Sequence, residues 1–231
     1  MKKIVLAILF LSSFCVQAQP TAVEGETAYN FWIQFPKQEI LENKPPVLIF
    51  LHGKSLSGKD LNRVKRYGVL KAIEKGLEIP AIVVAPQLPS GPWIPEKVNE
   101  VLEYVMAHYE VDPTRIYVAG MSLGSYGTMS FLGQYPDKIA AAVSICGGGE
   151  IKDACNLSTI PIAVYHGDKD FIVPVSESRK IVNAIKKCNK DAPVDFHILK
   201  GENHGTIENL FRKKDIYDWM FKHKKSIQTQ S

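Results

Sequence analysis

A Gly-x-Ser-x-Gly segment constrains this chain more than any other part of its sequence. Residues 116–120 are a short run rich in apolar and β-branched side chains, which is typical of a buried strand. Ser122 follows within Gly120-Met121-Ser122-Leu123-Gly124, and residues 125–132 can continue as a helix. A strand that turns sharply into a helix holds a serine at the turn in a strained conformation, with its hydroxyl exposed. The same pattern also occurs in glycine-rich turns without chemistry, so the rest of the chain must supply partners for Ser122.

Residues 1–18 predict an export signal that is not part of the fold. Lysines open this segment, an apolar run follows, and Val16-Gln17-Ala18 offers a small-x-small cleavage site. The apolar run is too short to span a membrane as a helix. We therefore expect a mature chain of residues 19–231 that is periplasmic or secreted, without stable membrane insertion. Cys15 raises the alternative of a lipoprotein, which is less favoured because the bulky Phe14 precedes it where a small residue is expected.

Composition and charge indicate an ordinary globular domain. The chain is 45% hydrophobic and 23% charged, with a formal net charge of +4. Removing Lys2 and Lys3 with the signal leaves +2, because the first eighteen residues hold no acidic side chain. A chain so near neutrality has no electrostatic case for binding nucleic acid. We find no repeat, low-complexity run or linker, so residues 19–231 are expected to form a single domain of unspecified oligomeric state.

Strand-like and helix-like segments alternate along the mature chain. The expected strands are apolar runs at residues 29–35, 47–51, 81–85, 116–120, 138–145, 160–165 and 194–199. The expected helices cover residues 59–76, 96–108, 125–132, 175–188 and 206–222. This alternation predicts an α/β fold with a mostly parallel central sheet and helices on both faces, and residues 29–35 are expected at the sheet edge.

Chemically capable side chains come at the ends of these predicted strands: His52, Ser122, Asp168, Asp170 and His204. Functional groups gather in the loops beyond the carboxyl ends of parallel strands. These side chains are therefore expected close together, at the carboxyl-terminal end of the sheet. A serine hydroxyl needs an imidazole to take its proton, and the imidazole needs a carboxylate to orient it. Ser122 is therefore the candidate nucleophile and His204 the candidate base. The spacing does not separate Asp168 from Asp170 as the acid.

Several further motifs accompany these residues: Leu51-His52-Gly53, Pro86-Gln87, residues 112–117, Tyr135-Pro136-Asp137, residues 145–148, His166 to Pro174 and Gly201 to His204. Over residues 47–220 the sequence resembles the α/β-hydrolases, and among them the esterases of the phospholipase/carboxylesterase and dienelactone-hydrolase-like groups. The resemblance implies the α/β-hydrolase fold, and the segment between the strands is short, so no large lid domain is expected. In the segment His-Gly-x-x-Asp-x-x-Val-Pro it makes Asp170 the triad acid and leaves Asp168 to hold the turn.

The same resemblance implies an oxyanion hole of two backbone N–H groups. Leu123, the residue after the nucleophile, supplies one, and the family pattern assigns the other to Lys54. His52 is a candidate for substrate binding or for a structural tie between loops, and Trp93 is either a pocket wall or a hydrophobic anchor. No cofactor is implied, and no His/Cys cluster has the spacing of zinc ligands.

Together these residues predict an exported serine esterase that hydrolyses carboxylic esters through an acyl-enzyme intermediate. The expected partner is a small-molecule or glycan ester, where the glycan rests on analogy alone. One alternative is a serine peptidase of the same fold, and another is a non-catalytic binding module on a hydrolase scaffold. The acyl and alcohol groups of the substrate are left open.

Three cysteines remain after removal of the signal: Cys146, Cys155 and Cys188. In a parallel sheet Cys146 ends a strand at the active-site end, whereas Cys155 precedes the next strand near the opposite end. The helix over residues 175–188 descends by roughly 20 Å, which brings Cys188 to that opposite end. A disulfide needs Cα atoms within about 7 Å, so we predict a Cys155–Cys188 disulfide with Cys146 free and buried. A Cys146–Cys155 disulfide is the rival.

Overall fold

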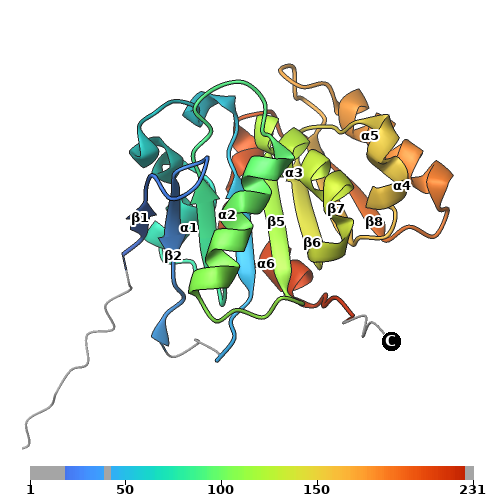
Figure 1. Ribbon diagram of the computed structural model, residues 1–231. Coiled ribbons are helices and arrows are strands. Elements are labelled where there is room, and N and C mark those ends of the chain that lie inside the picture. Colours follow the sequence, from blue (N-terminus) through green and yellow to red (C-terminus); the bar gives the residue numbers. More distant parts are fainter. Residues whose placement is uncertain (1–18, 39–42, 227–231) are drawn as a thin grey trace, which may run out of the picture.

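The computed structural model describes residues 19–38 and 43–226 (Figure 1). The predicted export signal lies outside the described residues. One eight-stranded sheet runs through the molecule in the order β1-β2-β4-β3-β5-β6-β7-β8. The strands are β1 Thr21–Val23, β2 Phe31–Gln34, β3 Val47–Leu51, β4 Ile82–Pro86, β5 Ile116–Met121, β6 Ala141–Ile145, β7 Ile162–Gly167 and β8 Val194–Leu199.

The register of the central strands sets the position of the site. Strand β3 pairs in parallel with both β4 and β5, with Val47 opposite Ile116 and Leu51 opposite Gly120. The carboxyl ends of β3 and β5 are therefore level. The residues that follow these two strands therefore lie beside each other, at the carboxyl-terminal end of the sheet, as expected for parallel strands.

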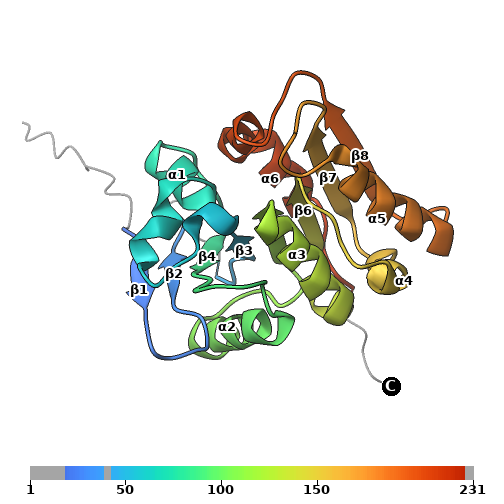
Figure 2. The same ribbon diagram turned by 90° about the horizontal axis from the view of Figure 1, so that it is seen from above.

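Helices cover both faces of the sheet (Figures 1 and 2). One face carries α2 Pro95–His108, α3 Leu123–Gln134, α4 Ala154–Leu157 and α5 Val175–Cys188, and the other carries α1 Val69–Glu74 and α6 Lys214–Phe221. Strand β3 shows why two layers form. Val47, Ile49 and Leu51 join the first core, whereas Leu48 and Phe50 join the second, because successive strand side chains point to opposite faces. The predicted fold class is confirmed.

The amino-terminal edge of the sheet differs from the expectation. The predicted edge strand at residues 29–35 is β2, which lies between β1 and β4 and is antiparallel to both. The edge position belongs to β1, a strand of three residues whose side chains are mostly exposed. So short and exposed a strand carries no hydrophobic alternation, and the sequence therefore gave no signal for it.

Two predicted helices are interrupted in the structure. The helix expected at residues 59–76 divides into a 3₁₀ segment, Leu61–Arg66, and α1. Gly68 separates them with a φ of 79°, and a methyl group there would lie 2.1 Å from the Phe50 ring, so both backbone and packing end the segment. The helix expected at residues 206–222 likewise divides into a 3₁₀ segment, Thr206–Arg212, and α6.

Other boundaries shift by smaller amounts. The strand expected at residues 138–145 begins only at Ala141, because a 3₁₀ turn over Pro136–Lys138 precedes it. The strand expected at residues 160–165 is β7, which extends to Gly167. Helix α5 has the predicted bounds.

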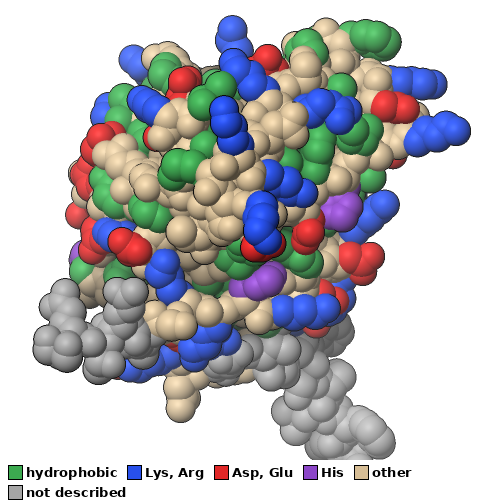
Figure 3. All heavy atoms as spheres, turned by 90° about the vertical axis from the view of Figure 1, so that its right-hand side faces the viewer, with side chains coloured by type: hydrophobic (Ala, Val, Ile, Leu, Met, Phe, Trp, Pro, Cys, Tyr) green, Lys and Arg blue, Asp and Glu red, His purple; other side chains and the backbone are tan. Residues whose placement is uncertain are grey.

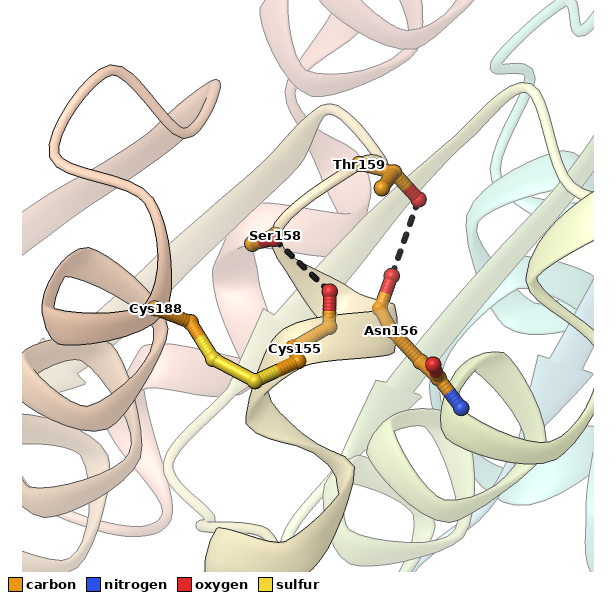
Figure 4. Close-up of a disulfide and its surroundings, with 5 residues drawn as sticks. All are labelled: Cys155, Asn156, Ser158, Thr159 and Cys188. Carbon is orange, nitrogen blue, oxygen red and sulfur yellow. Dashed lines mark hydrogen bonds between the residues drawn. A yellow bond between two sulfur atoms is a disulfide. The ribbon is translucent and has the colours of Figure 1, made fainter.

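The structure contains a disulfide between Cys155 in α4 and Cys188 at the end of α5, with Cα atoms 5.2 Å apart (Figure 4). This is the pairing that the topology predicted, and Cys146 is free and buried. Ser158 Oγ donates to the carbonyl of Cys155, and Thr159 Oγ donates to the carbonyl of Asn156 (Figure 4). The disulfide thus ties together two helices on the same face of the sheet.

The surface on the β8 side of the molecule mixes charges of both signs. Figure 3 shows Lys and Arg side chains interspersed there with Asp, Glu and apolar side chains. Over residues 19–38 and 43–226, no helix combines the length and the apolar character needed to cross a membrane.

Candidate active site

Ser122 lies at a sharp turn between β5 and α3. Its backbone has φ 56° and ψ −120°, a region that residues other than glycine seldom adopt. Close packing surrounds the turn. A methyl group on Gly120 would lie 2.2 Å from the carbonyl oxygen of Gly124, and one on Gly124 would lie 1.8 Å from that of Leu51. A side chain at either position would clash with the backbone, so only glycine fits at Gly120 and Gly124. This close packing supports the strained conformation of Ser122.

His204 connects Ser122 to Asp170. Its Nε2 lies 2.9 Å from Ser122 Oγ, and its Nδ1 lies 2.7 Å from Asp170 Oδ2. A carboxylate only accepts hydrogen bonds, so Nδ1 carries the proton and Nε2 is left to accept from the serine hydroxyl. The three side chains come from loops that follow β5, β7 and β8, and together they form one continuous chain of hydrogen bonds.

The Asp170 carboxylate is held from both sides. Its Oδ1 accepts the backbone N–H groups of Ile172 and Val173, each at 2.9 Å, while its Oδ2 faces His204. His166 supports the same loop, because its Nε2 lies 2.8 Å from the carbonyl oxygen of Val173. Asp170 is also buried. These contacts hold its carboxylate in one orientation, toward His204.

Asp168 occupies a different position. Its Oδ1 accepts the backbone N–H of Gly201 at 2.7 Å, and its side chain is exposed. The carboxylate ties the end of β7 to the turn that follows β8. Its contact is with the loop that carries His204, rather than with the imidazole ring itself.

A cavity of about 750 Å³ opens beside Ser122 and His204. Lys54 and Leu123 both line it, and Leu123 is the first residue of α3. The remaining lining residues are largely apolar or aromatic: Gly53, Ser55, Tyr67, Met121, Tyr126, Ile172, Val173, Gly205 and Glu208. A cavity of this size, with a few converging polar groups, is typical of a small-ligand site.

A protein-family model described as Phospholipase/Carboxylesterase matches residues 93–220. The match spans more than half of the chain and includes the Ser122 turn, Asp170 and His204. The chain belongs to the phospholipase/carboxylesterase family.

Solved structures agree with this placement at the level of the fold. A thermostable esterase is 24% identical, with a TM-score of 0.73, over 91% of this chain and 64% of that one. A ferulic acid esterase is 16% identical, with a TM-score of 0.67, over 88% of this chain and 97% of that one. These likenesses establish the α/β-hydrolase fold of this family member. The chain spans less than two thirds of the length of the thermostable esterase.

One curated relative is similar over a short stretch. Poly(3-hydroxyalkanoate) depolymerase C of Paucimonas lemoignei is 35% identical over 51 residues, which is 22% of this chain and 12% of the depolymerase. The chain thus matches only a small part of that protein's length.

His52 lies in the interior of this carboxylesterase-family chain and does not line the cavity beside Ser122. Its Nδ1 lies 2.8 Å from the carbonyl oxygen of Gly53, and the Leu88 N–H donates to its Nε2 at 3.1 Å. Burial lowers the pKa of His52 to about 4, which keeps the ring neutral. Of its two candidate roles, the contacts support the structural one, a tie between the end of β3 and the loop after β4.

Trp93 is a hydrophobic anchor in the structure rather than a wall of that cavity. The side chain is buried, and its Nε1 donates to the carbonyl of His52 at 3.1 Å. A methyl group on Gly127 of α3 would lie 2.6 Å from the Trp93 ring, so the helix packs directly on it. Trp93 lines a separate hollow of about 140 Å³ beside Leu123 and Tyr126.

Cys146 lies close to the hydrogen-bonded chain. Its Sγ and ligand atoms of Asp170 and His204 lie within 4.8 Å of one another. Burial, and then the charge of Asp170, raises the pKa of the Cys146 thiol to about 12. The sulfur is therefore a neutral thiol, which is a poor metal ligand.

Tyr67, Tyr126 and Glu208 line the cavity but were not predicted from the sequence. None of them lies in a recognisable motif, and the strand pattern carries no information about them. For Ile172 the sequence did carry a signal, because this residue lies in the His166–Pro174 motif, two residues after Asp170.

Proposed function

We propose that this chain is a serine hydrolase of carboxylic esters. Ser122 attacks the ester carbonyl, His204 takes its proton and passes it to the leaving alcohol, and Asp170 orients His204. Water then hydrolyses the acyl-enzyme by the reverse sequence of proton transfers. The observation that carries this proposal is the pair of hydrogen bonds from His204, at 2.9 Å to Ser122 Oγ and 2.7 Å to Asp170 Oδ2.

The oxyanion of the tetrahedral intermediate is bound by the backbone N–H groups of Leu123 and Lys54. Leu123 is at the amino end of α3, a helix of twelve residues, so the helix dipole adds to its N–H donor. Lys54 lines the same cavity from the segment after β3. Such a donor contributes about 3–4 kcal/mol to transition-state stabilisation.

We also propose that the protein is exported as a single domain, residues 19–231, after removal of residues 1–18. The Cys155–Cys188 disulfide supports this proposal, because structural disulfides persist mainly in oxidising compartments. The substrate is then an ester found outside the cytoplasm, either a small molecule or an acylated or feruloylated glycan. No cofactor takes part in the proposed reaction.

Labelling tests the nucleophile directly. A fluorophosphonate probe should add one adduct to the folded protein, at Ser122, and Ser122→Ala should lose both the adduct and ester turnover. Intact-mass analysis with peptide mapping reads the adduct. A folded wild-type protein that takes up no probe would support the binding-module alternative instead.

A substrate panel separates the remaining possibilities. We would compare p-nitrophenyl esters of increasing chain length, feruloyl esters, acetylated glycans and 3-hydroxyalkanoate oligoesters with matched peptide amides. Ester turnover without amide turnover is the expected result. Preferential cleavage of the amides would favour the peptidase alternative.

A further inference from the structure

We propose that Tyr67 is a further catalytic residue, whose hydroxyl donates a third hydrogen bond to the oxyanion. The inference rests on the proposed function, because an oxyanion forms only if Ser122 attacks a carbonyl. Tyr67 follows the 3₁₀ segment Leu61–Arg66, 14 residues after Gly53 and outside every recognised motif. Its side chain is nevertheless part of the cavity wall that includes Ser122 and His204.

The hydrogen bonds of Tyr67 leave its proton available. The backbone N–H of Gly53 donates to the phenol oxygen at 3.0 Å, and Ser55 Oγ donates to it at 3.2 Å. A phenol oxygen accepts in two directions and donates in one. With both accepting directions used by Gly53 and Ser55, the O–H is left to point toward a group in the cavity.

Gly53 lies between the Tyr67 hydroxyl and Ser122, and it has no side chain to separate them. A methyl group on Gly53 would lie 2.8 Å from the Tyr67 hydroxyl oxygen and 3.4 Å from Ser122 Cβ. The hydroxyl and the nucleophile therefore approach the same small space, which any other residue at position 53 would fill. Lys54, the proposed donor of a backbone N–H, is the next residue along the chain. The Tyr67 hydroxyl, which accepts from the Gly53 N–H, is thus next to the peptide that supplies the proposed Lys54 donor.

The protonation state of Tyr67 suits a donor. Burial raises the pKa of Tyr67, and the negative charge of Glu208 acts in the same direction. The phenol therefore stays neutral at the pH where an esterase works. A neutral donor held by two accepting hydrogen bonds is oriented before the reaction begins, which is the arrangement that favours oxyanion stabilisation.

Tyr67→Phe tests the assignment, because it removes the hydroxyl and keeps the ring. On a p-nitrophenyl ester we expect kcat to fall about 10²- to 10³-fold, with KM changed by less than about threefold, as for loss of an oxyanion donor. Tyr29→Phe is the matched control. It removes another phenol that accepts one backbone N–H, from Ile94 at 3.1 Å, and Tyr29 is not among the cavity-lining residues. The control should keep its kcat.

A second variant separates donation from a positioning role. Replacing Tyr67 alone by 3-fluorotyrosine makes the phenol more acidic, so it donates more strongly and accepts more weakly. If Tyr67 donates to the oxyanion, kcat should equal or exceed the wild-type value. If it merely positions Gly53 by accepting its N–H, kcat should fall. This variant keeps the hydroxyl, so it also serves if Tyr67→Phe fails to fold.

The outcomes are distinct. Equal kcat in wild type and Tyr67→Phe, or a loss of kcat with 3-fluorotyrosine, would overturn the role of Tyr67 and leave the proposed esterase intact. A wild-type protein that neither hydrolyses esters nor takes up the fluorophosphonate probe would overturn both proposals.

Discussion

Single residues of the site are held by backbone atoms from other segments. Asp170 uses both carboxylate oxygens, one for two backbone N–H groups and one for His204. Ser122 is fixed by a turn whose glycines admit no side chain. Because each group is held before substrate arrives, little reorganisation is needed during a reaction, which is the usual source of electrostatic catalysis.

Asp170→Asn should lower kcat by about 10³- to 10⁴-fold with little change in KM. The amide would place an N–H group where a carboxylate accepts, and His204 would then favour the wrong tautomer. Asp168→Asn is the matched control, because it changes the carboxylate that accepts from Gly201. It should lower the melting temperature and largely keep kcat. A larger loss of kcat in Asp168→Asn, with its melting temperature unchanged, would reverse the assignment.

His52 should make stability depend on pH. Its pKa is lowered by burial to about 4 in the folded protein, whereas an unfolded histidine titrates near about 6.5. The unfolded state therefore takes up the proton first as the pH falls. The stabilisation is fully present above about pH 6.5 and is lost progressively down to about pH 4, with about 2 kcal/mol gone by about pH 5.

Urea unfolding of the wild type and of His52→Gln at about pH 7.5 and about pH 5 checks this expectation. The variant should be less stable at the higher pH, because the hydrogen bonds to Gly53 and Leu88 are altered. It should lose less free energy of unfolding than the wild type between the two pH values. Equal losses in the two proteins would show that His52 does not contribute to the pH dependence.

At the scale of elements, the strands were easier to predict than the breaks in helices. Strands β3 and β5 are continuous apolar runs covered on both faces, and α5 has a clear helical period, so their sequences identify them. The break at Gly68 depends on Phe50, a residue of β3 that approaches it in space. A periodic pattern reports which face of a helix is apolar, but not where a distant side chain interrupts it.

Loss of the disulfide should lower stability without abolishing activity. It closes a loop with a sequence separation of 33 and joins α4 to α5, away from the cavity-lining residues. The double variant Cys155→Ser, Cys188→Ser should lose about 3–4 kcal/mol of unfolding free energy, because its unfolded chain is less constrained. Reduction of the wild type should cause the same loss, and reductant should leave the variant unchanged. A reductant effect of similar size in the variant would assign the loss to something other than this disulfide.

At the scale of the whole molecule, the candidate catalytic residues and the disulfide lie at opposite ends of the parallel strands. Ser122, Asp170 and His204 come after the carboxyl ends of β5, β7 and β8, whereas Cys155 lies before the start of β7. A parallel arrangement produces this separation, because each crossover returns the chain to the amino-terminal end of the strands before the next parallel strand begins. Changes in the disulfide and in the site should therefore affect different properties of the protein.

Export should leave two measurable marks. When the full chain is expressed in a bacterial host and recovered from outside the cytoplasm, its mass should correspond to residues 19–231, beginning at Gln19. After denaturation without reductant, one thiol per chain should react, that of Cys146. Unprocessed protein, or three reactive thiols in the exported form, would contradict the proposed export and oxidation.

The sequence by itself determined the class of fold and the order in which chemically capable residues follow the strands. Both depend on local patterns: apolar runs, helical periods and the Gly-x-Ser-x-Gly turn. Resemblance to known esterases then singled out Asp170, which spacing alone left equivalent to Asp168. Tertiary structure decided what local patterns cannot report, namely which side chains from distant segments meet. It buried His52 and Trp93, brought Tyr67 to the cavity, and set Asp170 rather than Asp168 against His204. These outcomes depend on strand order and on packing between remote residues, and such contacts leave no periodic signal in the sequence.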